Sequence, residues 1–142
     1  MSEDKPIVVD TNILFSALLN SQSGFVEVLL KSGHQFYICE QVFVELFKHK
    51  EKIVRLSRLS EDDIARLYHT LIRRISLYKE DLISPEHRAR ASALCQDIDE
   101  ADTPHVALTL ELDGRLWTGD KKLRDGLKEK GFDLFFTPER PV

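Results

Sequence analysis

Short runs of hydrophobic residues recur along the chain, and longer stretches with helical spacing separate them. A run of consecutive apolar residues bounded by polar ones is typical of a strand that is buried on both faces. Such runs predict strands at residues 7–9, 35–39, 116–118 and 134–136. Because strands separated by helices connect through right-handed crossovers, this order predicts helices on both faces of a parallel sheet. The expected fold class is α/β, a three-layer α/β/α sandwich with a central, mostly parallel sheet of about four to five strands.

Hydrophobic residues spaced three or four apart, together with residues that favour helix ends, predict the helices. Ser84-Pro85 and Thr103-Pro104 each place a capping residue before a proline, which is typical of a helix start. The other predicted helices cover residues 13–19, 25–31 and 41–56, and a short segment that contains Leu123 and Leu127.

The stretch 57–98 differs from the rest of the chain because its pattern is purely helical and charged. Ser60 with Asp63 resembles a capping box, and it opens a long helix that we expect to extend to about Lys79. We interpret the whole stretch as a helical arm or clip over one edge of the sheet.

The composition narrows the class of protein. With 42% hydrophobic residues and a net charge of −4, the 142-residue chain is not a disordered tail, and its length suits one domain over residues 1–142. A strongly basic nucleic-acid-binding protein is excluded, but a local acidic pocket is not. No apolar run approaches the ~18–20 residues of a membrane helix, and the N-terminus lacks the pattern of a secretory signal. We therefore expect a cytoplasmic protein without a membrane segment.

The two cysteines predict neither a disulfide nor a zinc site. Cys39 and Cys95 stand far apart, each in an apolar context, and neither belongs to a C-x-x-C pair. We expect both to be buried, inert thiols.

Acidic and polar residues follow the predicted strands, where open parallel sheets bind their ligands. The first strand delivers Asp10, Thr11 and Asn12, and the strand at 116–118 delivers Thr118 and Asp120. The other acids that this topology brings to the same edge are Glu45, Asp99 and Asp102.

Clustered carboxylates repel one another, and a hard divalent cation is the usual resolution. The sequence therefore predicts a Mg²⁺ or Mn²⁺ site in which no nearby histidine is an obvious ligand. The competing interpretation is purely structural: Asp10, Asp102 and Asp120 are each placed to cap a helix, Asp99 to favour a helix dipole, and Glu45 to lie on a solvated rim.

Four motifs resemble the PIN-domain nucleases, a family that includes VapC-type toxin ribonucleases. The motifs are IVVDTNILFSALL (7–19), VFVELFKH (42–49), DEADTPHVALTLEL (99–112) and RLWTGDKKL (115–123). They occur in the family's order over nearly the whole chain. The resemblance implies a PIN-like fold in which Asp10, Glu45, Asp102 and Asp120 are the catalytic, metal-binding acids and Asp99 is an additional acid. It also implies that Thr11, Asn12 and Thr118 orient the acids or the scissile phosphate.

The resemblance further implies metal-dependent hydrolysis of single-stranded RNA, and in many bacterial members a toxin role restrained by an antitoxin. Lys121, beside the acids, is a candidate for neutralising phosphate charge. The resemblance also implies a homodimer, and Leu14, Leu18 and Leu29 are equally consistent with a dimer surface or with the core. Because Trp117 lies in a predicted short strand, we expect it to pack in the core rather than to stack on a base. We also expect Phe47 to lie in the core.

Two other functions compete with this interpretation. The first is an Asp-based phosphotransfer protein, either haloacid-dehalogenase-like or receiver-like. The phosphatase pattern requires an acid where Asn12 stands, and the receiver pattern requires an Asp at the end of the third strand. The second is a catalytically inactive PIN module that binds RNA or protein, and the presence of all four acids argues against it. The tetrapeptide Asp-Glu-Ala-Asp at 99–102 does not indicate a helicase, because no phosphate-binding loop accompanies it.

Overall fold

The computed structural model describes residues 5–20 and 24–138. Within these residues, four parallel strands form a sheet with the spatial order β3-β2-β1-β4. The strands are β1 (Ile7–Val9), β2 (Phe36–Cys39), β3 (Ile75–Tyr78) and β4 (Arg115–Trp117). The α-helices are α1 (Thr11–Leu19), α2 (Gly24–Lys31), α3 (Glu40–Lys48), α4 (Lys50–Leu56), α5 (Glu61–Arg74), α6 (Pro85–Cys95), α7 (Thr103–Glu111) and α8 (Lys121–Glu129). Short 3-10 helices are formed by Glu80–Leu82 and Glu100–Asp102.

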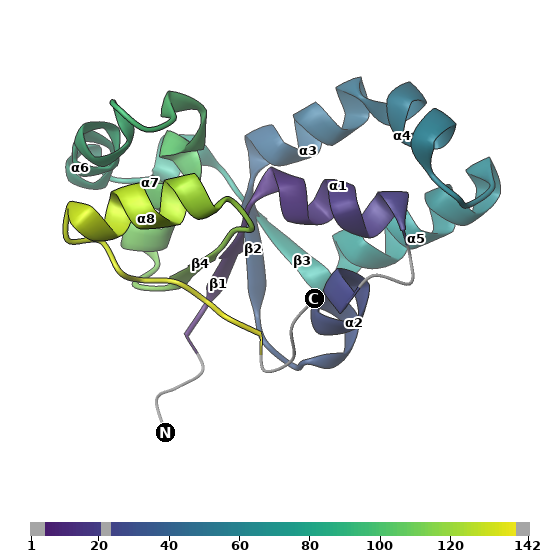
Figure 1. Ribbon diagram of the computed structural model, residues 1–142. Helices are drawn as coiled ribbons and strands as arrows, with labels where there is room; N and C mark the ends of the chain where they lie inside the picture. The colour runs from purple at the N-terminus through teal and green to yellow at the C-terminus, as the bar shows by residue number, and fades with distance from the viewer. Residues whose placement is uncertain (1–4, 21–23, 139–142) are drawn as a thin grey trace.

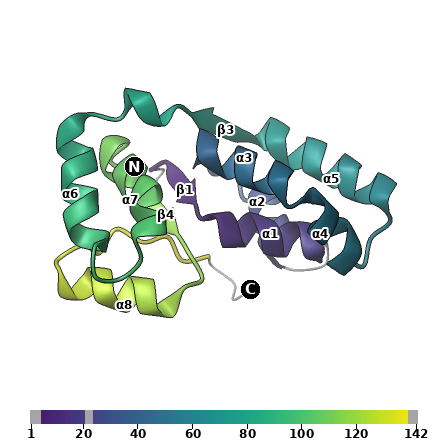
Figure 2. The same ribbon diagram turned by 90° about the horizontal axis from the view of Figure 1, so that it is seen from above.

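Helices cover both faces of the sheet, which confirms the predicted three-layer α/β/α fold. Helices α6, α7 and α8 lie on one side, and α1 to α5 lie on the other (Figure 1). The view from above in Figure 2 shows the same division. The strands β1 and β2 are apolar on both faces and need cover on both. Helix α7 supplies much of it, since it contacts β1, β2 and β4 and is buried from His105 to Thr109.

The stretch 57–98 is not purely helical, so that prediction is wrong. Helix α5 begins after the Ser60 cap as expected, but it ends at Arg74, and residues 75–78 form the edge strand β3. The apolar spacing that continues to Tyr78 matches a helix locally, whereas pairing with β2 makes the segment a strand. Because β3 has a neighbour on one side only, Leu77 remains 45% exposed.

Two other predicted elements differ in their extent. The helix predicted over 41–56 is divided into α3 and α4 at His49, whose backbone angles of φ −101° and ψ 17° are not helical. The strand predicted over 134–136 is reduced to a single parallel bridge between Leu116 and Phe135, beside β4. The sheet thus has four strands and the start of a fifth, within the part of the chain that the structure describes.

The cysteines and the tryptophan lie in the core, as expected. Cys39 and Cys95 are free and fully buried. Burial, followed by the negative charge of Glu80, raises the pKa of the Cys39 thiol to about 12, so this thiol is unreactive at neutral pH. Trp117 is 3% exposed and packs edge-on against Phe136.

The fold also assigns four residues whose location the sequence leaves open or predicts wrongly. Leu14, Leu18 and Leu29 are buried within the chain, so they belong to the core and cannot form a dimer surface. Phe47 is 58% exposed, which contradicts its assignment to the core.

None of the described helices is by itself long and apolar enough to cross a membrane.

Candidate metal centre

Asp10 lies immediately after β1 and is the N-cap of α1. Its side chain is 2% exposed, and both of its carboxylate oxygens accept hydrogen bonds. Oδ1 accepts from the backbone N–H of Asn12 at 2.8 Å, and Oδ2 accepts from the hydroxyl of Thr118 at 2.7 Å. Two fixed donors therefore hold this buried carboxylate in one orientation, and each oxygen keeps a lone pair for another partner.

Thr118 connects the ends of β4 and β1. Besides donating to Asp10, its Oγ1 accepts a hydrogen bond from the backbone N–H of Asp120 at 3.1 Å. Asp120 in turn caps α8, because its Oδ1 accepts from the backbone N–H of Leu123 at 3.1 Å. One threonine thus sets the positions of two acids that lie far apart in the sequence.

Asp99 and Asp102 approach the same place from the turn that precedes α7. Asp99 caps the 3-10 helix through a hydrogen bond from the N–H of Ala101 to its Oδ1, at 3.0 Å. Asp102 occupies the N-cap position of α7, yet its side chain makes no capping hydrogen bond. Capping therefore accounts for Asp10, Asp99 and Asp120 but not for Asp102.

The four aspartates meet in two overlapping groups. Single carboxylate oxygens of Asp99, Asp102 and Asp120 lie within 4.8 Å of one another. Asp10, Asp102 and His105 form a second group with ligand atoms within the same distance. Both groups line one cavity of about 390 Å³ at the carboxyl ends of the strands. The predicted convergence is thus present for the aspartates, with Asp102 common to both groups.

The electrostatics of Asp102 fit a bound cation. Burial, followed by the charges of Asp10, Asp99 and Asp120, raises the pKa of this carboxyl to about 7. A carboxylate that is partly removed from water and faces like charges is unstable in its ionised form. A divalent cation removes that cost, and carboxylate oxygens are the ligands that hard cations prefer. The residues present therefore fit a divalent metal ion.

His105 was not anticipated as part of this centre, and the expectation that no nearby histidine is an obvious ligand is wrong. The side chain is 6% exposed and lines the cavity. Its Nε2 lies 3.4 Å from the hydroxyl of Thr11, and its Nδ1 has no hydrogen-bond partner. Burial lowers the pKa of His105, although Asp10, Glu45 and Glu80 act in the opposite direction. The signal in the sequence is the D-x-x-H spacing of Asp102 and His105, which places both on one face of a helix.

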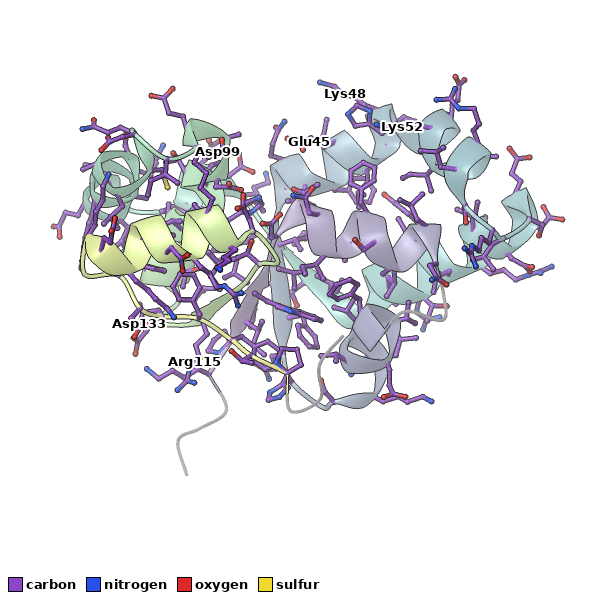
Figure 3. All side chains as sticks on the ribbon, viewed as in Figure 1. Glu45, Lys48, Lys52, Asp99, Arg115 and Asp133 are labelled. Carbon is purple, nitrogen blue, oxygen red and sulfur yellow. The ribbon has the colours of Figure 1, made fainter. Side chains whose placement is uncertain are left out.

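Glu45 lies on the opposite wall of the cavity, on α3. Its side chain extends from the upper part of the molecule, across from Asp99 (Figure 3). Glu45 does not belong to either group of ligand atoms. It therefore contributes negative charge to the cavity wall without joining either group.

Of the remaining polar candidates, two line the cavity and one does not. Thr11 and Asn12, in the first turn of α1, line the cavity. Lys121 begins α8 next to Asp120, but it is exposed and is not among the described residues that line the cavity.

Three residues on the α1, α3 and α4 side of the cavity were not anticipated from the sequence. Phe15, His49 and Lys52 line it together with the acids. The rings of Phe15 and His49 lie 5.8 Å apart at an interplanar angle of 56°. Figure 3 shows Lys52 at the same end of the molecule as Glu45, whereas Arg115, at the start of β4, lies at the other end. No local motif marks these residues, because only the packing of α1 against α3 and α4 brings them to the cavity.

We expect Thr118→Val to destabilise the protein by about 1–3 kcal/mol, because valine leaves a buried oxygen of Asp10 and the N–H of Asp120 without their partner. Thr118→Ser keeps the hydroxyl and is the matched control. Urea unfolding of the two variants measures the difference. Equal destabilisation by serine and valine would show that the methyl group matters rather than the hydrogen bonds.

The family model of the PIN domain matches residues 8–134. None of the curated proteins matches the chain significantly.

Proposed function

The chain belongs to the PIN-domain family, and on that premise we propose that it is a Mg²⁺- or Mn²⁺-dependent endoribonuclease that hydrolyses phosphodiester bonds of single-stranded RNA. Family membership makes it a nuclease-type hydrolase and distinguishes it from the phosphotransfer alternatives. The main support for catalysis within this chain is the convergence of Asp10, Asp99, Asp102 and Asp120 on one cavity.

The aspartates of the two groups would hold a divalent cation in the cavity, next to the scissile phosphate. A bound divalent cation supplies charge neutralisation at the phosphate and a lowered pKa for the attacking water. In the reaction, the water oxygen forms a bond to phosphorus and gives up a proton, one P–O ester bond breaks, and the leaving oxygen keeps the electron pair of that bond and takes up a proton. Thr118 keeps the Asp10 carboxylate in its orientation through the 2.7 Å hydrogen bond. Positioning of this kind accounts for most of the catalysis of phosphoryl transfer, because the protein does little covalent chemistry itself.

The α1, α3 and α4 side of the cavity supports a single-stranded substrate. Bases of a single strand are free to stack on aromatic rings, and Phe15 and His49 present two such rings beside the acids. Lys52 adds a positive charge at the same wall, where it can pair with a phosphate. A duplex keeps its bases stacked on one another and cannot use these rings.

The test is cleavage of a labelled single-stranded RNA oligonucleotide with Mg²⁺ or Mn²⁺. We expect chelator to stop cleavage and Asp10→Asn, which retains the shape of the side chain, to lower the rate at least about 100-fold. Single-stranded DNA and duplex RNA of the same sequence are expected to react at least about tenfold more slowly.

Each result has a distinct meaning. Cleavage that persists in chelator or in folded Asp10→Asn protein would overturn the metal mechanism. Equal rates on RNA and DNA, or on single and double strands, would overturn the substrate assignment while leaving the nuclease activity in place.

We extend the proposal to the biological setting on the family resemblance alone. As a toxin ribonuclease, the protein would have a cognate antitoxin, and a gene for a small DNA-binding protein should adjoin its own. A homodimer is part of the same proposal, with a surface other than the buried Leu14, Leu18 and Leu29.

A further inference from the structure

The imidazole of His105 is a buried side chain that lines the acidic cavity and has two nitrogens able to bind a metal ion. One of its ring nitrogens lies within 4.8 Å of carboxylate oxygens of both Asp10 and Asp102. The Nδ1 atom has less than 1 Å² of exposed surface and no hydrogen-bond partner. Leaving such an atom without a partner costs about 1–3 kcal/mol, so a buried polar atom of this kind requires an explanation.

The surroundings of the His105 ring favour a cation as a partner for one of its two nitrogens. Asp10 comes from the end of β1, and Asp102 lies one turn before His105 at the start of α7. Two carboxylates and one imidazole therefore converge from two elements on a single point that the cavity reaches. Among the described residues, the Thr11 hydroxyl lies 3.4 Å from Nε2, and Nδ1 has no hydrogen-bond partner.

The two overlapping groups differ in chemistry. The group of Asp99, Asp102 and Asp120 offers oxygen atoms only, which suit Mg²⁺. The group of Asp10, Asp102 and His105 offers a nitrogen ligand as well, and imidazole favours first-row transition metals over Mg²⁺. We propose that Asp10, Asp102 and His105 form a site that selects a first-row transition-metal ion over Mg²⁺, with the imidazole as a direct ligand. This inference rests on the proposed metal-dependent function, and it assigns the preference for one metal ion over another to His105.

Calorimetric titration of the metal-free protein with Co²⁺, Mn²⁺ and Mg²⁺ tests the selectivity. In His105→Asn we expect Co²⁺ and Mn²⁺ affinity to fall at least about tenfold and Mg²⁺ affinity to change less than about threefold, because the all-oxygen group remains intact. His49→Asn is the matched control, since His49 lines the same cavity but belongs to neither group. Its affinities for the three ions should match those of the wild type. An equal loss for all three ions in His105→Asn, or no loss, would overturn the proposal.

A second measurement needs no variant, in case the buried histidine cannot be replaced without unfolding. Electron spin-echo spectroscopy of the wild-type protein loaded with Mn²⁺ detects a ¹⁴N nucleus bound directly to the ion. We expect that nitrogen signal, and its absence at full loading would overturn the proposal. Neither measurement contains RNA, so the site can fail while the protein cleaves RNA, and the protein can fail to cleave RNA while the site binds metal.

Discussion

Asp102→Asn is expected to reduce the rate of RNA cleavage by more than about 100-fold and to weaken the binding of every divalent cation. This loss exceeds the one expected for a residue that only hydrogen-bonds to a metal ligand. The reason is that Asp102 is the one residue common to both groups of ligand atoms. The variant removes the charge and retains the shape of the side chain. Initial cleavage rates, together with metal titration of the same preparations, measure the effect.

The matched control for this substitution is Asp97→Asn. Asp97 lies five positions earlier, its side chain is 69% exposed, and it pairs with Lys130 at 3.2 Å, outside the acidic cavity. Exposed pairs of this type contribute about 0–1 kcal/mol, so the control should cleave RNA at the wild-type rate. Folded Asp102→Asn protein that keeps wild-type metal affinity would contradict the assignment of this residue to the centre.

In the absence of metal, Asp102→Asn is expected to raise the free energy of unfolding above neutral pH. The carboxyl has an ordinary pKa of 3.8, and the folded protein raises it to about 7. Between these pH values the folded state holds a proton that the unfolded chain has released, so the free energy of unfolding falls as the pH rises. Asparagine cannot ionise and removes this loss. We expect a gain of about 1–2 kcal/mol at pH 8, after allowing for the solvent that screens this half-buried group.

The measurement is urea unfolding of wild type and Asp102→Asn in chelator, from pH 4 to pH 8. The difference between the two proteins should be absent near pH 4 and grow until the pH exceeds 7. Glu111 makes the free energy of unfolding rise with pH, because hydrogen bonds from the Ser84 N–H and from His87 lower its pKa. This contribution is the same in both proteins, so it cancels in their difference. A difference that does not vary with pH would contradict the raised pKa of Asp102. Saturating divalent cation should reverse the order and make the wild type the more stable protein.

Most of the strand-end chemistry could be predicted from the sequence because it depends on local features. Asp10 and Asp120 each follow a short apolar strand, and a parallel sheet brings such ends to one edge. The helix caps were predictable for the same reason: Ser60 and Ser84 cap the helices that follow them. The two interpretations of the acids are also not exclusive, since Asp10, Asp99 and Asp120 cap helices and face the cavity at the same time.

The features that the sequence missed depend on contacts between distant segments. Ile75 continues the apolar spacing of α5, and only its alignment with Phe36 of β2 turns 75–78 into a strand. His105 resembles an ordinary residue of a buried helix until α7 is packed against the ends of β1 and β4. Phe47 has the spacing of a core residue, but α3 turns it outward to 58% exposure.

The layers of the fold and the kind of chemistry could be predicted without coordinates, because hydrophobic periodicity and the polarity of strand ends depend on a few neighbouring residues. Only the tertiary structure decided which acids share a ligand position, that Glu45 stands apart from them, and that an imidazole lies among them. The reason is physical: a metal ligand must lie within a few ångströms of its partners, and distances of that size between Asp10, Asp102 and Asp120 are set by the packing of α7 and α8 on the sheet, which no local pattern encodes.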